Sequence, residues 1–395
     1  MKRLLGILFL LSLPITSAVA APKSIPVQLG SSFPAPANTE GFTLNGKNII
    51  YLQNLTAKSS DVVLTAFDLS GTQLWQRTID SGVDEVATAI TADPLGNIWV
   101  AGSAASAPAV ESATVLTGID NPDAVNVDPG NSLRPEMNQI ALWKISPAGE
   151  LLATYLSPQK SLPIVTAISA TSSGVSIIGT LDSKSFEVNA NAGLFGKMLS
   201  IGTAKSELNA VARNADGSTS VFGSSAETLA GKKVAGIRDG VLIKISKAGA
   251  VTSVVRSSAI KASRSWISAD ATNLVSGPVV TGKVIETAIT KFSTSFTPTW
   301  TLRVPSTGAS TSLSANGNSY LAFTSKGSVS GISGFKPTLP TLLILTFDSK
   351  GVIKAATAIP GLVTPISLQY SAGRGVVGLA SSSDGTVSIF TLVSR

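Results

Sequence analysis

The sequence contains no histidine and no cysteine. Without an imidazole there can be no Ser-His-Asp triad, no histidine general base and no histidine-ligated zinc or copper site. Without a thiol there can be no cysteine nucleophile, no thiolate metal site and no disulfide. Any catalysis by this chain must therefore use carboxylates, tyrosine, lysine or arginine.

Charged residues are also scarce, at 13% of the chain, and Lys plus Arg (30) outnumber Asp plus Glu (23). Nucleic-acid-binding proteins concentrate Lys and Arg in runs or stripes, whereas the longest basic cluster here is Lys232-Lys233. We interpret the excess as a mildly basic surface and expect no nucleic-acid partner. Beyond the N-terminal segment no apolar run reaches membrane-spanning length, so we also expect no membrane span.

The first twenty residues have the pattern of a secretory signal peptide. Met1–Arg3 is a charged start, Leu4–Leu13 is an apolar stretch too short to span a bilayer, and Ala18–Ala20 supplies the small-x-small cleavage site. We expect cleavage near Ala20 and a mature domain of residues 21–395, secreted or associated with the cell envelope. A domain of this size can bury a large core without disulfides.

What the sequence does contain is an alternating pair of hairpin patterns. One half is clearest at Asp93–Gly102 and Ala212–Gly223, and the other at Ile140–Leu156, Val241–Val255 and Leu342–Ile359. Each consists of two short apolar runs around a turn with Gly or Asp, which is typical of β-hairpins. Uninterrupted units follow one another at roughly 44 residues, the length of a four-stranded propeller blade.

We therefore predict an all-β chain folded as a single β-propeller of four-stranded antiparallel blades. Seven candidates for the first half of a unit begin near Phe42, Val86, Ile164, Leu208, Trp266, Thr311 and Ile366. Seven candidates for the second half begin near Val62, Ile140, Phe186, Val241, Ala288, Leu342 and Val387. These numbers predict seven blades.

Two parts of this pattern are irregular. The second hairpin of blade three, Phe186–Ile201, is interrupted by Asn and Gly residues, so six blades is the alternative. The last unit offers only one strand, Thr386–Val393, in its second half, and the apolar segment Ile25–Leu29 has no hairpin partner. We expect Ile25–Leu29 to complete the last blade, which would close the ring and cover two open sheet edges.

The segment Val86–Gly102 resembles the seven-bladed propeller repeats of exported bacterial proteins, which are related to the NHL-type propellers. Those repeats carry Asp-x-x-Gly-Asn-aromatic-Val-x-Gly, present here from Asp93 to Gly102. Their second half has an Asp before an apolar strand, then Lys and a turn ending in Gly, as in Asp239–Gly249; Leu142–Gly149 shares the strand, Lys and turn. The resemblance implies a β-propeller fold and export of the protein. Because these are turn and core positions, it implies no catalytic residue.

The expected propeller places function on one face. Loops between the second and third strands of a blade lie on the same face as the loops between blades, and the long insertions fall between second and third strands: 105–138, Ser225–Arg238 and Ser325–Leu339. The turns of the opposite face are tight. Since loops on a rigid scaffold commonly carry binding residues, we assign the ligand site to the decorated face.

The largest insertion contains an acidic cluster that includes Asp120, Asp123 and Asp128. A hard cation such as calcium takes about six to eight oxygen ligands, but the spacing here is not that of the twelve-residue calcium loop. Asn-Pro and Asp-Pro are also ordinary turn formers. We interpret residues 118–138 as a turn-rich structural loop, with calcium binding and a partner contact as alternatives, and we predict neither a metal site nor a cofactor.

The loops between blades supply the remaining candidate binding residues: Asp84, Glu85, Lys160, Lys205, Arg264 and Trp266. Asp84 and Glu85 are neighbours in an extended segment, so their side chains should point to opposite sides and form a poor catalytic pair. Arg264 and Trp266 share a face, and a guanidinium beside an indole suits a carboxylate, a sugar or an aromatic ligand. The ordinary alternative is that Trp266 packs between blades, as we expect of Trp75, Trp99, Trp143 and Trp300.

We therefore expect an exported, non-enzymatic propeller that binds an extracellular protein, a glycan or an envelope polymer through its decorated face. The alternative is an extracellular enzyme acting on carbohydrates or esters by carboxylate or tyrosine chemistry. A sialidase-type Asp-box, Ser-x-Asp-x-Gly-x-x-Trp, would support that alternative, and the sequence contains none. A purely architectural role in the envelope is not separable from binding at this level.

Overall fold

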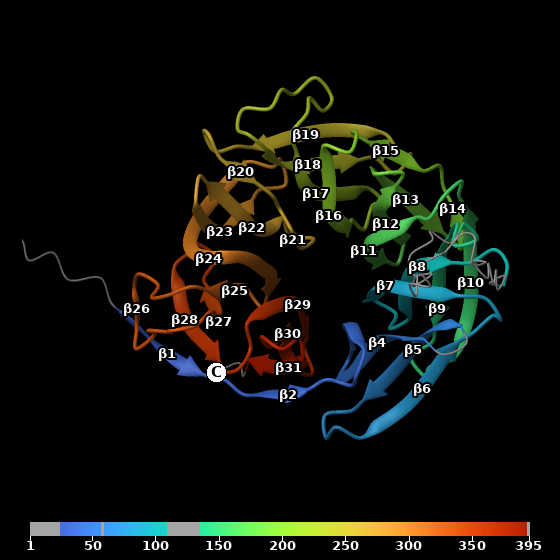
Figure 1. Cartoon of the computed structure of the whole chain (residues 1–395), viewed down its shortest axis with the longest axis horizontal. Helices are drawn as coiled ribbons and strands as arrows, with labels where there is room; N and C mark the ends of the chain where they lie inside the picture. The colour runs from blue at the N-terminus through green and yellow to red at the C-terminus, as the bar shows by residue number, and fades with distance from the viewer. Residues whose placement is uncertain (1–23, 57–58, 109–134, 393–395) are drawn as a thin grey trace, which may run out of the picture.

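A computed structural model describes residues 24–56, 59–108 and 135–392 of the chain. The expected signal peptide, residues 1–20, and the acidic residues Asp120, Asp123 and Asp128 lie outside this range. Every regular element in the described range is a β-strand, which confirms the all-β prediction there. The strands form sheets that stand side by side around a common axis (Figure 1).

Five of these sheets are separate blades. The first blade consists of β3 (Thr39–Asn45), β4 (Asn48–Thr56), β5 (Ser60–Phe67) and β6 (Gln73–Ile79). The second consists of β7 (Glu85–Ala92), β8 (Ile98–Ala104), β9 (Gln139–Ile145) and β10 (Leu151–Pro158). The third consists of β11 (Ile164–Thr171), β12 (Gly174–Leu181), β13 (Lys184–Asn191), β14 (Leu194–Phe195) and β15 (Leu199–Ile201).

The fourth blade consists of β16 (Ser206–Arg213), β17 (Thr219–Ser225), β18 (Asp239–Ile245) and β19 (Val251–Ser257). The closing blade consists of β29 (Thr364–Ser371), β30 (Gly375–Ser381), β31 (Val387–Leu392) and β2 (Ser32–Pro34). The remaining strands form one 10-stranded sheet, called the long sheet below. Its strands are β20 (Ser263–Arg264), β21 (Ser268–Ala269), β22 (Leu274–Thr281), β23 (Val284–Phe292), β24 (Pro298–Ala315), β25 (Asn318–Ser325), β26 (Ile332–Ser333), β27 (Thr341–Phe347), β28 (Ile353–Ile359) and β1 (Ile25–Leu29).

The prediction of seven blades, with six as the alternative, is wrong as a description of these sheets. In the described part of the chain only five blades are separate, and the strands expected to form further blades are joined in the long sheet. The joint is β24, which pairs with β23 from Pro298 to Pro305 and with β25 from Ser306 to Ala315. Hydrogen bonding therefore continues through a position where we expected one blade to end and the next to begin.

The reason for this continuity lies in small buried hydroxyl side chains. We expected a break before Thr311, in the segment that contains Ser306 and Ser310. The Ser306 hydroxyl instead lies 2.8 Å from that of Thr287, and Ser310 donates to Ser276 at 3.3 Å. Both serines are buried, and a buried hydroxyl is costly without a partner. Their partners on neighbouring strands therefore keep the segment in the sheet, with an irregular register between Ser306 and Ser310.

The inner strands nevertheless contact one another in a closed order: β3, β7, β11, β16, β21, β24, β29 and again β3. The N-terminal segment crosses the outside of this ring in two steps. We expected Ile25–Leu29 in the last blade, but this strand, β1, pairs in parallel with β28 of the long sheet. The short β2 that follows it pairs with β31, Phe33 lying opposite Ile389. The expectation was therefore wrong: the strand that completes the closing blade is β2, the next strand along the chain, and not Ile25–Leu29.

The hydrophobic core lies between neighbouring sheets. One cluster joins Leu52 and Leu64 of the first blade to Val100 and Trp143 of the second, and a comparable cluster packs the second blade against the third. Trp143 is 1% exposed. The prediction that tryptophans belong to these interfaces is confirmed for Trp99 and Trp143, which are buried in the clusters, and for Trp75, which packs against one of them. Trp300 packs against a cluster formed within the long sheet.

The last glycine of the repeat signature has a structural role in each blade where it recurs. Strand β7 has a bulge between Ala87 and Ala89, and Gly102 of β8 lies opposite. A methyl group on Gly102 would lie 2.0 Å from the Val86 carbonyl oxygen. Gly223 stands in the same relation to the bulge of β16, where the distance would be 1.9 Å to the Glu207 oxygen. These glycines let the inner strands bulge without a clash.

A second close approach joins the tight turns to the neighbouring blade. The Trp75 ring of the first blade lies against Gly149, in the turn between β9 and β10, so that a methyl group there would lie 2.5 Å from Cδ2. Trp300 lies against Gly351 in the same way, at 2.6 Å. An aromatic ring on one blade thus fits a glycine turn of the next.

The variant Gly149→Ala tests this joint. Gly149 and Gly249 end equivalent Ser-x-Ala-Gly turns with positive φ angles of 87° and 76°, but a methyl group on Gly249 would meet nothing within 4 Å. Gly249→Ala should cost only the left-handed backbone strain, about 1 kcal/mol. Gly149→Ala should cost about 1–3 kcal/mol more because of the clash with Trp75. Urea unfolding of both variants measures the difference, and equal losses would show that the Trp75 contact is not a structural joint.

Candidate functional site

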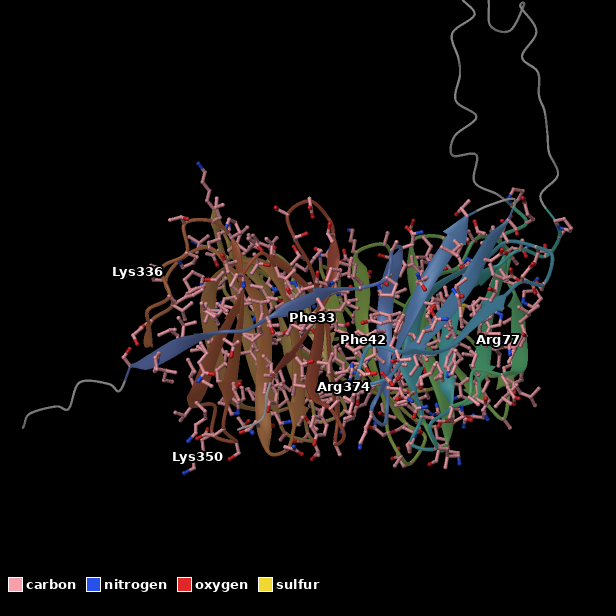
Figure 2. All side chains as sticks on the ribbon, turned by 90° about the horizontal axis from the view of Figure 1, so that it is seen from below. Phe33, Phe42, Arg77, Lys336, Lys350 and Arg374 are labelled. Atoms are coloured by element: carbon pink, nitrogen blue, oxygen red, sulfur yellow. The ribbon has the colours of Figure 1, made fainter. Side chains whose placement is uncertain are left out.

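The two faces of the ring differ as the sequence predicts. The insertions 105–138, Ser225–Arg238 and Ser325–Leu339 each connect the second and third strands of a repeat. Lys336, from the last of these, and Lys350, from the tight turn between β27 and β28, lie at opposite edges of the molecule (Figure 2). We call the side with the insertions the loop face.

On the loop face, Asp84 and Glu85 are buried between the first and second blades. Asp84 accepts a hydrogen bond from the Ser60 amide at 2.6 Å. Glu85 accepts from the amide of Ser81, at 3.1 Å, and from its hydroxyl. Burial raises the pKa of Glu85, and the nearby charges of Asp61 and Asp80 raise it further. These described contacts hold the junction between the first two blades together; a ligand-binding role for Asp84 and Glu85 stays a prediction.

Arg264 and Trp266 lie together in the interior, between the fourth blade and the long sheet. The guanidinium carbon of Arg264 lies 5.0 Å from the Trp266 ring centre, and Trp266 is 0% exposed. Arg264 donates to the Ser257 hydroxyl at 2.6 Å. Burial lowers the Arg264 pKa to about 10, and the charge of Arg303 acts in the same direction. Trp266 therefore packs between sheets, as the alternative interpretation of this residue expected. Ligand binding by Arg264 and Trp266 stays a prediction, and it would require the two sheets to separate.

Lys160 and Lys205 are exposed in loops that connect neighbouring blades. Within the described part of the chain, no hydrogen bond or ion pair joins them to Asp84, Glu85 or Arg264. The predicted site residues are therefore distributed around the ring and do not form one contact group. Their role as binding residues stays a prediction.

One hollow of the structure was not foreseen from the sequence. It has a volume of about 640 Å³ and lies between the first blade and the closing blade, beside β2; we call it the seam pocket. Much of its lining is apolar or aromatic: Phe33, Pro34, Pro36, Ile49, Tyr51, Phe67, Leu69 and Ile389. Its polar lining comes from Asp68, Ser70, Arg374 and Thr391.

The seam pocket exists because the fourth strand of the closing blade is short. Strand β2 has three residues and covers β31 only from Ser388 to Phe390, which leaves Thr391 at the pocket wall. Pro34 and Pro36 have no amide hydrogen to continue the ladder. The Ala35 amide still donates to the Val387 carbonyl at 3.0 Å, and the chain leaves the sheet edge after it. A hollow remains beside this short outer strand.

One guanidinium and one phenol give the seam pocket its polarity. Arg374 donates from Nη2 to the Asp68 carbonyl at 2.7 Å, while its buried Nε has no hydrogen-bond partner among the described residues. Burial lowers the pKa of Arg374, although the charges of Tyr51 and Asp68 oppose this. Burial also raises the pKa of Tyr51 to about 12, so the phenol stays neutral. The pocket thus combines apolar rings with one guanidinium.

The rim of the seam pocket exposes large apolar side chains. Phe33 is 67% exposed and Leu69 is 56% exposed. Inside, the rings of Tyr51 and Phe67 meet edge to face with centroids 5.7 Å apart. Figure 2 shows Phe33 and Arg374 on the same side of the molecule. Exposed aromatic residues next to an arginine are typical of protein-binding hot spots.

A second hollow of about 520 Å³ lies on the other side of the closing blade, against the long sheet. Tyr320 and Tyr370 line it, and the Tyr370 hydroxyl donates to Asn316 at 2.8 Å. Leu29, 76% exposed, stands at its edge. Both hollows flank the closing blade, where the N-terminal segment replaces a regular outer strand.

No family model matches this sequence, and no curated protein matches it either. Solved structures do. The β-propeller domain of Cps50 (Swd1) from Myceliophteria thermophila has a TM-score of 0.51 at 9% identity, covering 92% of this chain and 100% of that chain. The WD40 domain of Toxoplasma gondii coronin has a TM-score of 0.50 at 12% identity, covering 94% and 90%. The β-propeller domain of the Trilobed protease from Pyrococcus furiosus gives 0.48 at 11% identity, covering 93% and 97%.

These similarities, together with the closed order of inner strands, define the fold as an all-β propeller with four-stranded blades. Identities this low show the fold alone. The finer resemblance to exported bacterial repeats stays an expectation. The described residues contain no helix long and apolar enough to cross a membrane.

A buried carboxylate outside these hollows makes the stability of the fold depend on pH. Glu187 of β13 is 1% exposed, and burial raises its pKa to about 7. Hydrogen bonds from Thr219 and Asn189 and the charge of Arg213 oppose the shift without cancelling it. The native state therefore binds the Glu187 proton more tightly than the unfolded state does.

The variant Glu187→Gln should remove this dependence. In the unchanged protein, the contribution of the Glu187 proton to the stability of the fold is complete below pH 4.5. This contribution declines as the pH rises to about 7, and it is lost above that pH. The variant should therefore gain stability over the parent by up to about 3 kcal/mol between pH 4.5 and pH 8. Thermal unfolding across this range measures the gain, with the exposed Glu150→Gln as control. A difference independent of pH would contradict the assignment.

Proposed function

We propose that this chain is an exported, non-enzymatic β-propeller that binds an extracellular or envelope protein at the seam pocket. The observation that carries the proposal is the exposed Phe33 beside Arg374, whose buried Nε has no described partner. Export is supported by the signal-peptide pattern of residues 1–20. Mass spectrometry of the exported protein should find an N-terminus at or near Ala21.

The size and chemistry of the seam pocket favour a peptide segment over a small polar metabolite. A volume of about 640 Å³ lies within the range of ligand sites and accommodates a few side chains. The rings of Phe33, Tyr51 and Phe67 offer apolar contact, while Arg374 offers a donor to a carboxylate. We therefore infer that the bound segment carries an apolar side chain next to an acidic group.

The lining is better suited to binding than to carboxylate catalysis. Asp68 is the acidic residue among the described residues that line the seam pocket. Its Oδ1 accepts from the Ser70 hydroxyl at 2.6 Å and from the amides of Thr72 and Ser70 at 2.9 and 2.8 Å, and these bonds lower its pKa. A carboxylate engaged by its own turn is a weak base. A glycosidase-type mechanism needs a pair of carboxylates, and the seam pocket supplies one.

Selection of a random peptide library on the mature protein tests the proposal. The selected peptides should share an apolar residue beside an acidic one. By calorimetry, Phe33→Ala should weaken their binding at least tenfold, about 1.4 kcal/mol, because an exposed aromatic contact is lost. Arg374→Lys should weaken acidic peptides more than their amide counterparts, since the planar guanidinium is lost.

Two variants serve as controls for this experiment. Leu95 is 75% exposed in a turn of the second blade, so Leu95→Ala should leave binding unchanged. Phe33 is itself exposed, so Phe33→Ala should leave the unfolding midpoint unchanged. Peptides that bind all variants equally, or a protein that retains glycan fractions and no peptides, would contradict a protein-binding role for the seam pocket.

A further inference from the structure

Three carboxylates converge on the loop face where the first and second blades meet. Asp61 is the second residue of β5, Asp80 follows β6 and Glu85 begins β7, and each places an oxygen within 4.8 Å of the other two. Among the described residues no lysine or arginine forms an ion pair with any of them. Like charges at this separation repel one another by several kcal/mol in a partly buried setting. The cluster therefore favours a neutralising ligand.

The second observation is an unpartnered oxygen. Glu85 is 1% exposed, and its Oε1 accepts the two hydrogen bonds from Ser81. Its Oε2 is buried and has no hydrogen-bond partner among the described residues. A buried carboxylate oxygen without a donor loses the hydration it has in water. Glu85 belongs to the cluster, and a cation bound there would supply a contact for this carboxylate.

The other two carboxylates are held in place by local hydrogen bonds. The Ser59 hydroxyl donates to Asp61 Oδ1 at 2.9 Å, and the Gly82 amide donates to Asp80 Oδ1 at 2.8 Å. Each bond uses one oxygen and fixes the orientation of the side chain. Asp61 comes from the first blade and Glu85 from the second, so a shared ligand would join the two blades.

We propose that Asp61, Asp80 and Glu85 bind a calcium ion. An all-oxygen donor set is typical of calcium and magnesium, whereas zinc prefers nitrogen and sulfur ligands. Calcium–oxygen distances of about 2.3–2.6 Å allow ligands on opposite sides to lie about 4.6–5.2 Å apart, while magnesium requires about 4.0–4.2 Å. The three oxygens lie within 4.8 Å of one another, close enough for one calcium ion to contact all of them, and calcium tolerates irregular geometry that magnesium does not. Water would complete the coordination.

Calcium titration of the mature protein, first treated with chelator, tests the proposal. Calorimetry should find calcium binding, and calcium should raise the unfolding temperature. Asp80 is exposed, so Asp80→Asn should fold normally while weakening calcium binding at least tenfold. Glu85→Gln should abolish it. Magnesium at the same concentration should produce a smaller rise in unfolding temperature.

A variant of the acidic insertion tests whether calcium binds at the Asp61, Asp80 and Glu85 cluster or in the insertion. The triple variant Asp120→Asn, Asp123→Asn and Asp128→Asn should keep the calcium-dependent rise that Asp80→Asn loses. The opposite pattern would overturn the proposal. So would a protein that binds no calcium at millimolar concentration and is stabilised by Glu85→Gln at neutral pH, because the cluster would then be neutralised by a proton. Neither outcome depends on peptide binding at the seam pocket.

Discussion

In the second and fourth blades, glycine opposite a bulge lets the inner strand lie close against the second strand of the same blade. Gly102 and Gly223 occupy positions where any side chain would collide with a backbone carbonyl of the inner strand. The apolar clusters pack the sheets formed in this way against their neighbours, and the contact of Trp75 with Gly149 joins the outer strand of the first blade to a turn of the second.

Much of the strand pattern could be predicted from the sequence because it is local. The turn at Asp93 is an example: its carboxylate accepts from the amides of Leu95 and Asn97 and from the Trp99 indole, which explains the spacing of the repeat signature. Strand boundaries between blades were harder to predict. Nothing local shows that β24 continues through Ser306, because the hydroxyl partners that keep it in the sheet come from other strands.

The candidate sites could be predicted less well, because they combine residues distant in the sequence. The seam pocket joins Phe33 and Tyr51 to Arg374, which become neighbours only when the ring closes. Likewise, Asp61, Asp80 and Glu85 come from two blades. Spacing also could not distinguish the packing of Trp266 from ligand binding, since both put an aromatic residue at the start of a blade. The sequence showed where loops are long, and the structure adds a hollow where a strand is short.

We propose that the protein partner binds in the seam pocket, beside the closing blade, and not among the insertions of the loop face. Hydrogen exchange of the mature protein, with and without a saturating selected peptide, measures where this partner binds. We expect added protection in segments 31–35, 69–72 and 371–375, which surround the seam pocket. Protection confined to residues 105–138 or Ser225–Arg238 would place the peptide on the loop face and overturn the proposal.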